Sequence, residues 1–301
     1  MKKRTEVWMV MAIAVGLMTG CGGRPSSGTA TTAAVAAGTT TAAKTTAEKA
    51  EEGIPAEEKT EAEKDTAAED AEILVAAAAS LKNAYEEELI PMFQEANPGV
   101  TVKGTYDSSG KLQTQIEEGV EADVFMSAAV KQMNALDEEG MIASDTITDL
   151  LENKIVLIVP TGQEGTMSAF EDIADAESVA LGDPASVPAG QYAQEALTSL
   201  GVWDKIQDKV SFGTNVTEVL NQVAAASADA GIVYATDAAS MADQVVVVAE
   251  APEGSLADKV IYPVAVVGES AHEEQAKAFV EFLKTQEALA VFEAYGFSAA
   301  E

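Results

Sequence analysis

The 301-residue sequence has very little of two residue types on which much enzyme chemistry depends. It contains one cysteine, Cys21, and one histidine, His272. A single cysteine excludes an intrachain disulfide and a cysteine-ligated zinc finger, and a single histidine excludes the two-histidine zinc sites. Any triad of the Ser-His-Asp type would have to use His272. These absences argue against most classical hydrolytic chemistry.

Positive charge is also scarce. The chain has 18 Lys and Arg residues against 50 Asp and Glu residues, a formal net charge of −32. From Glu72 onward there are ten lysines, no arginine and 39 acidic residues. Because affinity for nucleic acids comes largely from Lys and Arg contacts with phosphates, a nucleic-acid partner is excluded. Any anion site in this part of the chain must also work without the bidentate guanidinium group of arginine.

The N-terminus has the order of features found in secretory signals. Three basic residues at positions 2–4 precede an apolar run over residues 7–18 and then small residues. This run is too short for a permanent membrane span, which needs about 20 residues, so we expect residues 1–20 to be removed as a signal peptide. Residues 18–21 (MTGC) resemble a bacterial lipobox, which implies cleavage before Cys21 and lipidation of its thiol. The alternative is a plain signal peptide followed by an incidental cysteine.

Residues 21–71 have the composition of a disordered tether. They are rich in Ala, Thr, Glu and Lys and have almost no large apolar side chains. Such a segment cannot bury enough apolar surface to offset the entropy lost on ordering. As a flexible chain it would keep the following domain on the order of a few tens of ångströms from a membrane.

From Glu72 onward, apolar strands alternate with helical segments, which is typical of an α/β fold with mostly parallel sheets. One doubly wound sheet or two smaller sheets would fit this length. Two very apolar segments, 154–160 and 258–267, favour two lobes, with the chain leaving the first lobe and later returning to it. We expect strands at residues 73–77, 100–106, 123–127, 155–159, 179–182, 231–234, 245–248 and 261–267.

Small residues and hydroxyls recur where these strands end. In open α/β sheets, ligands bind beyond the carboxyl ends of strands, where helix N-termini offer unpaired N–H groups and a positive dipole end. Each feature also has a plain structural interpretation, such as a capped helix, an inert turn or a core tyrosine. None of these turns carries a carboxylate pair or a metal-ligand cluster, so together they predict a neutral donor site for an anion. The turns and strand ends concerned contain Ser80, residues 107–110, the loop at residues 182–190, residues 215–216 and Tyr234.

Several motifs, in order, resemble those of the molybdate-binding proteins that serve ABC transporters. The resemblance runs from about residue 72 to residue 298. It implies a two-lobed fold like that of periplasmic binding proteins, each lobe a mostly parallel sheet flanked by helices, with a two-strand hinge. Residues 72–154 plus 258–301 would form lobe I, and residues 155–257 lobe II. The motifs are 77–81 (AAASL), 108–109 (SS), 122–128 (ADVFMSA), 182–190 (GDPASVPAG), 231–234 (GIVY), 262–266 (YPVAV) and 295–297 (YGF).

The same resemblance implies which residues bind the oxyanion. The family's serine after the first strand corresponds to Ser80, and the serine of its second turn to Ser109. Its loop alanine corresponds to Ala189, its valine at a helix start to Val216 and its tyrosine to Tyr234. One departure is the sequence Ser-Gly-Lys at residues 109–111, where some members have Ser-Ser-Thr, because it places Lys111 beside an otherwise neutral site.

The function implied is that of a binding protein, not an enzyme, with no cofactor. It would capture molybdate or tungstate, deliver the ion to an ABC permease and act as a monomer. It would be extracytoplasmic, anchored through Cys21 to the outer face of the plasma membrane, or periplasmic if an outer membrane is present. Two alternatives stay open: a binder of another anion such as sulfate, and a secreted serine hydrolase using Ser80 or Ser109. The hydrolase lacks an evident histidine partner, because His272 belongs to an acidic helix start.

Overall fold

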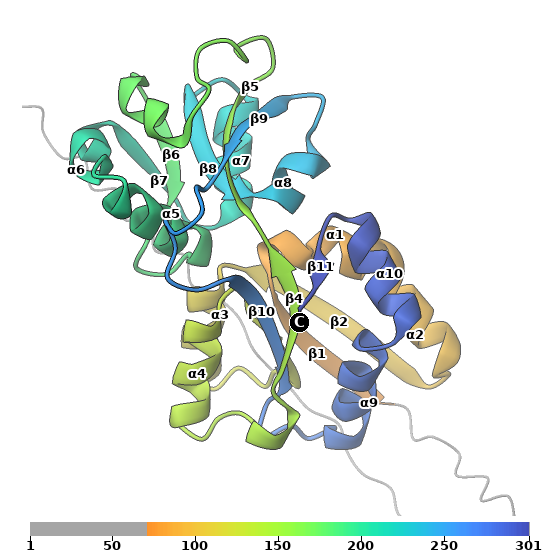
Figure 1. The fold of residues 1–301 in the computed structure, drawn as a ribbon. Coiled ribbons are helices and arrows are strands. Elements are labelled where there is room, and N and C mark those ends of the chain that lie inside the picture. Colours follow the sequence, from red (N-terminus) through yellow and green to blue (C-terminus); the bar gives the residue numbers. More distant parts are fainter. Residues whose placement is uncertain (1–70, 301) are drawn as a thin grey trace, which may run out of the picture. The chain divides into compact units, whose positions relative to one another are not determined.

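Two β-sheets, each flanked by helices, form the part of the chain described by the computed structural model, residues 71–300 (Figure 1). The predicted signal peptide, Cys21 and the predicted tether lie outside the described residues, apart from Ala71, which is the first residue of strand β1. Within residues 71–300, no helix combines the length and apolar character needed to cross a membrane.

The first sheet has six strands in the order β11-β4-β10-β3-β1-β2. Strand β1 is parallel to both β2 and β3, whereas β10 is antiparallel to β3 and β4, and β11 is antiparallel to β4. We call this sheet and its helices the six-stranded lobe. Its strands are β1 (Ala71–Ala78), β2 (Val100–Asp107), β3 (Val124–Met126), β4 (Thr148–Asn153), β10 (Val260–Val266) and β11 (Ser298–Ala299).

The second sheet has five strands in the order β7-β6-β8-β5-β9 and, with its helices, forms the five-stranded lobe. Strand β6 is parallel to β7 and β8, and β5 is antiparallel to β8 and β9. Its strands are β5 (Ile155–Pro160), β6 (Val179–Gly182), β7 (Val210–Gly213), β8 (Ala230–Tyr234) and β9 (Val245–Glu250).

Both sheets are therefore mixed, and the prediction of mostly parallel sheets was wrong in this respect. Parallel pairs arise where a helical crossover separates two strands, as between β1 and β2 or between β6 and β7. Strands β5 and β10 enter their sheets directly from the other lobe, without such a crossover, and they run antiparallel to their neighbours. The predicted two-lobed architecture itself is confirmed.

Helices cover both faces of the six-stranded sheet, with α3 and α4 on one face and α2, α9 and α10 on the other (Figure 1). Side chains alternate between these faces along a strand: Ala76 packs in a cluster with Leu112 of α3, and its neighbour Val75 in a cluster with Phe279 of α9. The helices are α1 (Lys82–Ala84), α2 (Ile90–Ala96), α3 (Ser109–Glu117), α4 (Val130–Glu138), α9 (Glu273–Leu283) and α10 (Gln286–Ala294).

In the five-stranded lobe, the helix starts agree with the local sequence. Pro188 occupies the first turn of α5, where its missing N–H removes no helical hydrogen bond. Asn215 caps α7, because its Oδ1 accepts a 3.0 Å hydrogen bond from the backbone N–H of Glu218. The helices are α5 (Pro188–Ser199), α6 (Trp203–Ile206), α7 (Val216–Ala224) and α8 (Ala235–Ser240).

The chain crosses between the lobes twice, as the two apolar segments predicted. Lys154 alone separates β4 from β5, and residues 251–259 lead from β9 back to β10. An ion pair lies at each crossing: Lys154 with Glu250 (3.0 Å) and Lys259 with Glu152 (2.8 Å). Exposed pairs of this kind contribute about 0 to 1 kcal/mol, so the strand pairing on either side stabilises the crossings more than the charges do.

Candidate oxyanion site between the lobes

All five residues predicted to bind the ligand line one small cavity between the two lobes. The six-stranded lobe contributes Ser80 and Ser109, and the five-stranded lobe contributes Ala189, Val216 and Tyr234. The other lining residues are Ala78, Ala79, Asp107, Ser108, Ala128, Val187 and Pro188.

Helix N-termini meet at this cavity. Helix α3 begins at Ser109, α5 at Pro188 and α7 at Val216. The N–H groups of a first helical turn have no acceptor within the helix, and the dipole makes this end favourable for negative charge. Because Pro188 has no N–H, the first free amide of α5 belongs to Ala189, which is completely buried. The cavity can therefore supply backbone donors from both lobes.

The backbone of Ala128 connects the two lobes through two residues that line the cavity. Its N–H donates to Ser109 Oγ (2.9 Å), and its carbonyl accepts from the hydroxyl of Tyr234 (3.2 Å). Since Ser109 Oγ receives this hydrogen bond, the serine's own hydrogen is left for another acceptor. The buried Ser109 is thus held as a hydrogen-bond donor at the edge of the cavity.

The phenol of Tyr234 remains a donor over the accessible pH range. Burial, which disfavours the charged phenolate, raises the pKa of Tyr234 well above its ordinary value. Its ring packs edge-on against that of Tyr262, with centroids 5.5 Å apart. The hydroxyl therefore stays protonated, and in this structure its hydrogen is donated to the carbonyl of Ala128.

Ser108 is a candidate functional residue that the sequence analysis did not select. It lies at the N-cap position of α3, yet its side chain makes no capping hydrogen bond. Its Oγ is buried at the cavity and has no hydrogen-bond partner. Buried hydroxyls are nearly always paired, so this one has an unmet requirement that a ligand oxygen would satisfy. The sequence signal was the pair of adjacent serines, of which only Ser109 was chosen.

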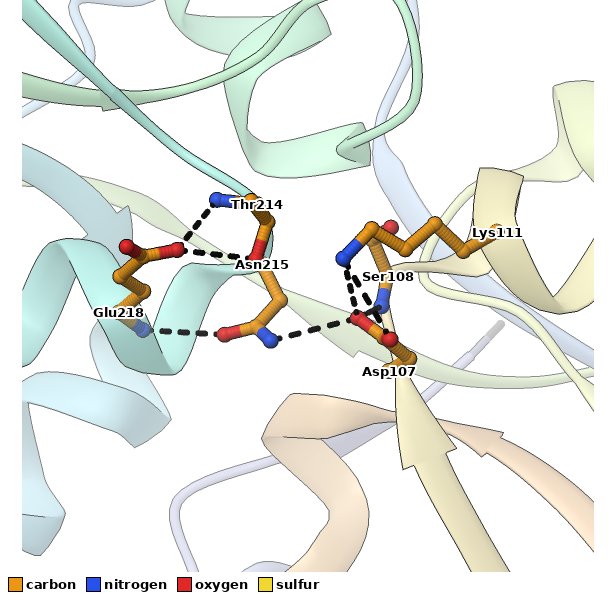
Figure 2. A network of polar contacts seen from close by, with 6 residues as sticks. All are labelled: Asp107, Ser108, Lys111, Thr214, Asn215 and Glu218. Atoms are coloured by element: carbon orange, nitrogen blue, oxygen red, sulfur yellow. Dashed lines mark hydrogen bonds and ion pairs between the residues drawn. The ribbon is translucent and has the colours of Figure 1, made fainter. Parts of the chain in front are cut away.

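A carboxylate also lines the cavity, which the sequence analysis did not anticipate. Oδ1 of Asp107 accepts hydrogen bonds from Ser108 N (2.8 Å), Lys111 Nζ (3.2 Å) and Asn215 Nδ2 (3.2 Å), as Figure 2 shows. Lys111 is therefore ion-paired with Asp107, and the two charges cancel locally. The lysine of the Ser-Gly-Lys sequence at residues 109–111 therefore adds no net charge beside the cavity.

A second set of contacts, also visible in Figure 2, holds the α7 end of this network. Glu218 accepts hydrogen bonds from Thr214 N (2.7 Å) and Thr214 Oγ1 (2.9 Å). The backbone hydrogen bond from Thr214 is the main cause of a lowered pKa of Glu218, so this group is ionised at neutral pH. Together with the cap made by Asn215, these bonds fix the turn that presents the first amides of α7.

Further contacts hold the lobes together around the cavity. The N–H of Gly110 donates to the carbonyl of Ser186 (2.9 Å), and Gln132 Nε2 donates to Gln191 Oε1 (3.3 Å). Both pairs join the six-stranded lobe to the five-stranded lobe. The two lobes are therefore in direct contact beside the cavity.

The residues required for hydrolysis do not gather at this site. His272 lies at the N-cap of α9 and does not line the cavity that contains Ser80 and Ser109. In the part of the chain that the structure describes, no three His, Cys, Asp or Glu side chains form a metal-binding group. Hydroxyls and the first amides of helices are the hydrogen-bond donors that the described residues bring to the cavity.

Comparison with known proteins assigns the family. The sequence profile of bacterial extracellular solute-binding proteins matches residues 73–298, about three quarters of the chain. The chain belongs to this family. A solute-binding protein described as a putative ABC transporter substrate-binding lipoprotein, from Bacillus subtilis (strain 168), is 39% identical over 227 residues, covering 75% of this chain and 86% of the relative.

Two further relatives of this solute-binding protein are named for molybdate or molybdenum. The molybdate-binding protein of Haemophilus influenzae is 38% identical over 241 residues, covering 77% of this chain and 92% of that protein. The solved substrate-binding domain of a putative molybdenum ABC transporter from Clostridium difficile is 38% identical, with a TM-score of 0.60, and covers 77% of this chain and 100% of that domain.

Proposed function

We propose that this solute-binding protein captures molybdate, or the similar tungstate ion, in the cavity between its lobes and delivers it to an ABC permease. The observation that carries the proposal is the convergence of hydroxyl and amide donors from both lobes on one small cavity whose carboxylate is paired with a lysine. The names of the relatives that are 38% identical support molybdate as the ligand.

Hydrogen bonding alone is strong enough for tight capture. We assign three hydroxyls, those of Ser80, Ser109 and Tyr234, and about four backbone N–H groups to the dianion, with the Tyr234 hydroxyl turning from the carbonyl of Ala128 to the ligand. Charge-assisted hydrogen bonds contribute about 1.5 to 3 kcal/mol each, which gives on the order of 10 to 20 kcal/mol before costs. Nanomolar binding needs about 12 kcal/mol net, so this donor set suffices without a cation if the closed lobes exclude water.

A panel of anions tests the ligand assignment. Melting temperature and titration calorimetry with molybdate, tungstate, sulfate and phosphate should show strong effects for the first two ions. Replacing Ser109→Ala or Tyr234→Phe should weaken molybdate binding by about 1 to 3 kcal/mol each. A response to sulfate alone would identify a different solute, and unchanged affinity in both variants would place the site elsewhere.

We also propose that the protein acts outside the cytoplasm as a lipid-anchored monomer attached through Cys21 to the outer face of the plasma membrane. The lipobox-like residues 18–21 and the name of the Bacillus subtilis relative support this. In cells, a Cys21→Ser variant should lose lipid labelling and pass from the membrane fraction into the medium or the periplasm. Membrane retention of that variant would contradict the anchor.

Release to a permease requires the lobes to separate. We propose that residues 72–154 with 258–301 move as one body and residues 155–257 as the other, bending at the two crossings. The membership of the strands in two separate sheets supports this division. Small-angle scattering should report a smaller radius of gyration with molybdate than without it, and identical values would argue against the motion.

A further inference from the structure

Negative charge dominates the surface that a dianion must approach. From Glu72 onward the chain has ten lysines and no arginine against 39 acidic residues. Such a surface repels anions and slows their association, most strongly at low salt. The positions of the lysines that no carboxylate neutralises therefore matter for the capture of an anion.

Most of these lysines have a partner for their ammonium group. Six form ion pairs with carboxylates, and Lys209 donates to the backbone carbonyls of Ala174 and Ala176. Within the described residues, the lysines whose ammonium groups have no such partner are Lys82, Lys131 and Lys205. All three are exposed to solvent.

Lys82, at the start of α1, differs from the other two by its place between the lobes. It lines two hollows, of about 210 and 640 Å³, whose walls come from both lobes. Ala79 lines both hollows and also the oxyanion cavity, so the three spaces are adjacent. Each hollow can hold several water molecules, so a hydrated ion can come beside Lys82 before it reaches the cavity. Lys131 and Lys205 line neither hollow.

Two carboxyl groups face the same hollows. Glu218 lines the larger one and is ionised, because the backbone hydrogen bond from Thr214 lowers its pKa. Asp237 lines the smaller one, and burial raises its pKa to about 7, so part of it is uncharged at neutral pH. Among the described residues that line these hollows, Lys82 is the only basic one. Without its charge, both hollows would be negative and would repel a dianion.

We propose that Lys82 is the entry residue of the site, whose ammonium group attracts the molybdate dianion into the space between the lobes and does not hold it after they close. The inference rests on the proposed function and deepens it. Lys82 does not line the oxyanion cavity, and Lys111, which lies beside that cavity, is already paired with Asp107. An exposed charge in such a place acts on the rate of association more than on the rate of dissociation.

Substitutions that change the charge of Lys82 in steps test this role. For a charge about 8 Å from a dianion in water, Lys82→Gln should slow association about fourfold at an ionic strength of about 0.01 M, about twofold at about 0.15 M and not measurably at about 1 M. Lys82→Glu changes the charge by two units, so its effect at the lowest salt should be about fifteenfold. Lys82→Arg keeps the charge and should keep the wild-type rate.

Lys205→Gln and Lys205→Glu are the matched controls. They change the net charge of the protein by the same amounts, at an exposed lysine of α6 that also lacks a partner and lines neither hollow. They should slow association less than the corresponding Lys82 variants. Calorimetry gives the dissociation constant for molybdate, and chasing radiolabelled molybdate from the mature protein with unlabelled ion gives the dissociation rate. The association rate is the second divided by the first, and the dissociation rate should be the same in all variants.

Three results would overturn the inference. Equal rates of association in the Lys82 and Lys205 variants would mean that only net charge matters. Faster dissociation in Lys82→Gln would mean that Lys82 holds the bound ion. A loss that is the same at about 0.01 and about 1 M salt would indicate a structural role, because screening removes the effect of an exposed charge. Failure of the wild-type protein to bind molybdate would instead refute the proposed function, so the two failures are distinguishable.

Discussion

Asn215 of the five-stranded lobe donates a hydrogen bond from Nδ2 to Oδ1 of Asp107 in the six-stranded lobe, over 3.2 Å (Figure 2). The same asparagine caps α7 through its Oδ1. One side chain therefore both caps the start of α7 at the cavity and joins the lobes beside it. Asp107 is in turn balanced by Lys111, so the contact forms without leaving an uncompensated negative charge beside the cavity.

Asn215→Asp separates these two roles. Aspartate caps a helix as well as asparagine does, so the ligand-free protein should keep its melting temperature. The new carboxylate would face Asp107 across the lobes, and like charges in contact disfavour closure. We expect molybdate affinity to fall at least tenfold by calorimetry. The double variant Asp107→Asn with Asn215→Asp restores a donor–acceptor pair and should recover much of the loss. Wild-type affinity in the single variant would show that the contact between Asn215 and Asp107 does not support closure of the lobes.

Gly110→Ala should impair closure for a steric reason. A Cβ at this position would lie 2.5 Å from the carbonyl oxygen of Ser186 in the other lobe, and its nearest neighbours are all backbone atoms of Ser186. Backbone cannot move aside as a flexible side chain can, so the lobes must stay further apart. We expect molybdate affinity to fall more than tenfold, with little change in the melting temperature of the ligand-free protein. Gly165→Ala, where a Cβ meets no atom within 4 Å, is the control.

Much of the fold could be predicted because the buried strands are continuous apolar runs. Strand β6 occupies Val179–Gly182, the same residues as the expected strand, and β5 exceeds its expected range by one residue. Strand β4 (Thr148–Asn153) was missed because its sequence, TDLLEN, is mostly polar or charged and it is stabilised by its pairing with β10 and β11. The antiparallel pairing of β5 and β10 was not predicted for a related reason. The apolar pattern of a strand does not show which strand it will pair with or in which direction.

The residues that line the cavity were predictable as types of residue at strand ends, while the contacts among them were not. The turns containing Ser80 and Ser109 lie directly after strands, and the structure brings both serines to the same cavity. The ion pair of Lys111 with Asp107 depends on a side-chain direction at the start of α3 that spacing alone leaves open. The partner of Ser80, Tyr262, lies 182 residues away in the sequence, so only the folded sheet brings the two together.

Ser108→Ala tests the hydroxyl that has no partner. Burying an unpaired hydroxyl costs about 1 to 3 kcal/mol, so its removal should leave the ligand-free protein equally or more stable. If the hydroxyl donates to the bound anion, molybdate affinity should fall by about 1 to 3 kcal/mol. Ser127→Ala is a useful contrast, because the buried Ser127 hydroxyl is paired with the backbone of Ala129 and its loss should lower stability. A Ser108→Ala variant with unchanged affinity would remove Ser108 from the site.

Asp237 predicts a distinctive dependence of stability on pH. It lies on α8 and is 6% exposed, and its Oδ2 has no hydrogen-bond partner. Burial raises the pKa of Asp237 to about 7, although the backbone N–H groups of Tyr234 and Asp237 itself partly offset this effect. Between its ordinary pKa near 3.8 and the raised value, the folded protein holds a proton that the unfolded chain has released.

The contribution of Asp237 to the free energy of unfolding therefore falls as pH rises through this window, by at most about 1.4 kcal/mol per pH unit, and becomes level above a pH of about 7. Asp237→Asn keeps an oxygen acceptor for the backbone N–H groups and does not titrate. Urea unfolding of both proteins at several pH values should show the variant gaining stability relative to wild type from about pH 4 to about pH 7, and then a constant difference. Since the many surface acids are common to both proteins, parallel curves would mean that the carboxyl of Asp237 is ionised in the folded state throughout.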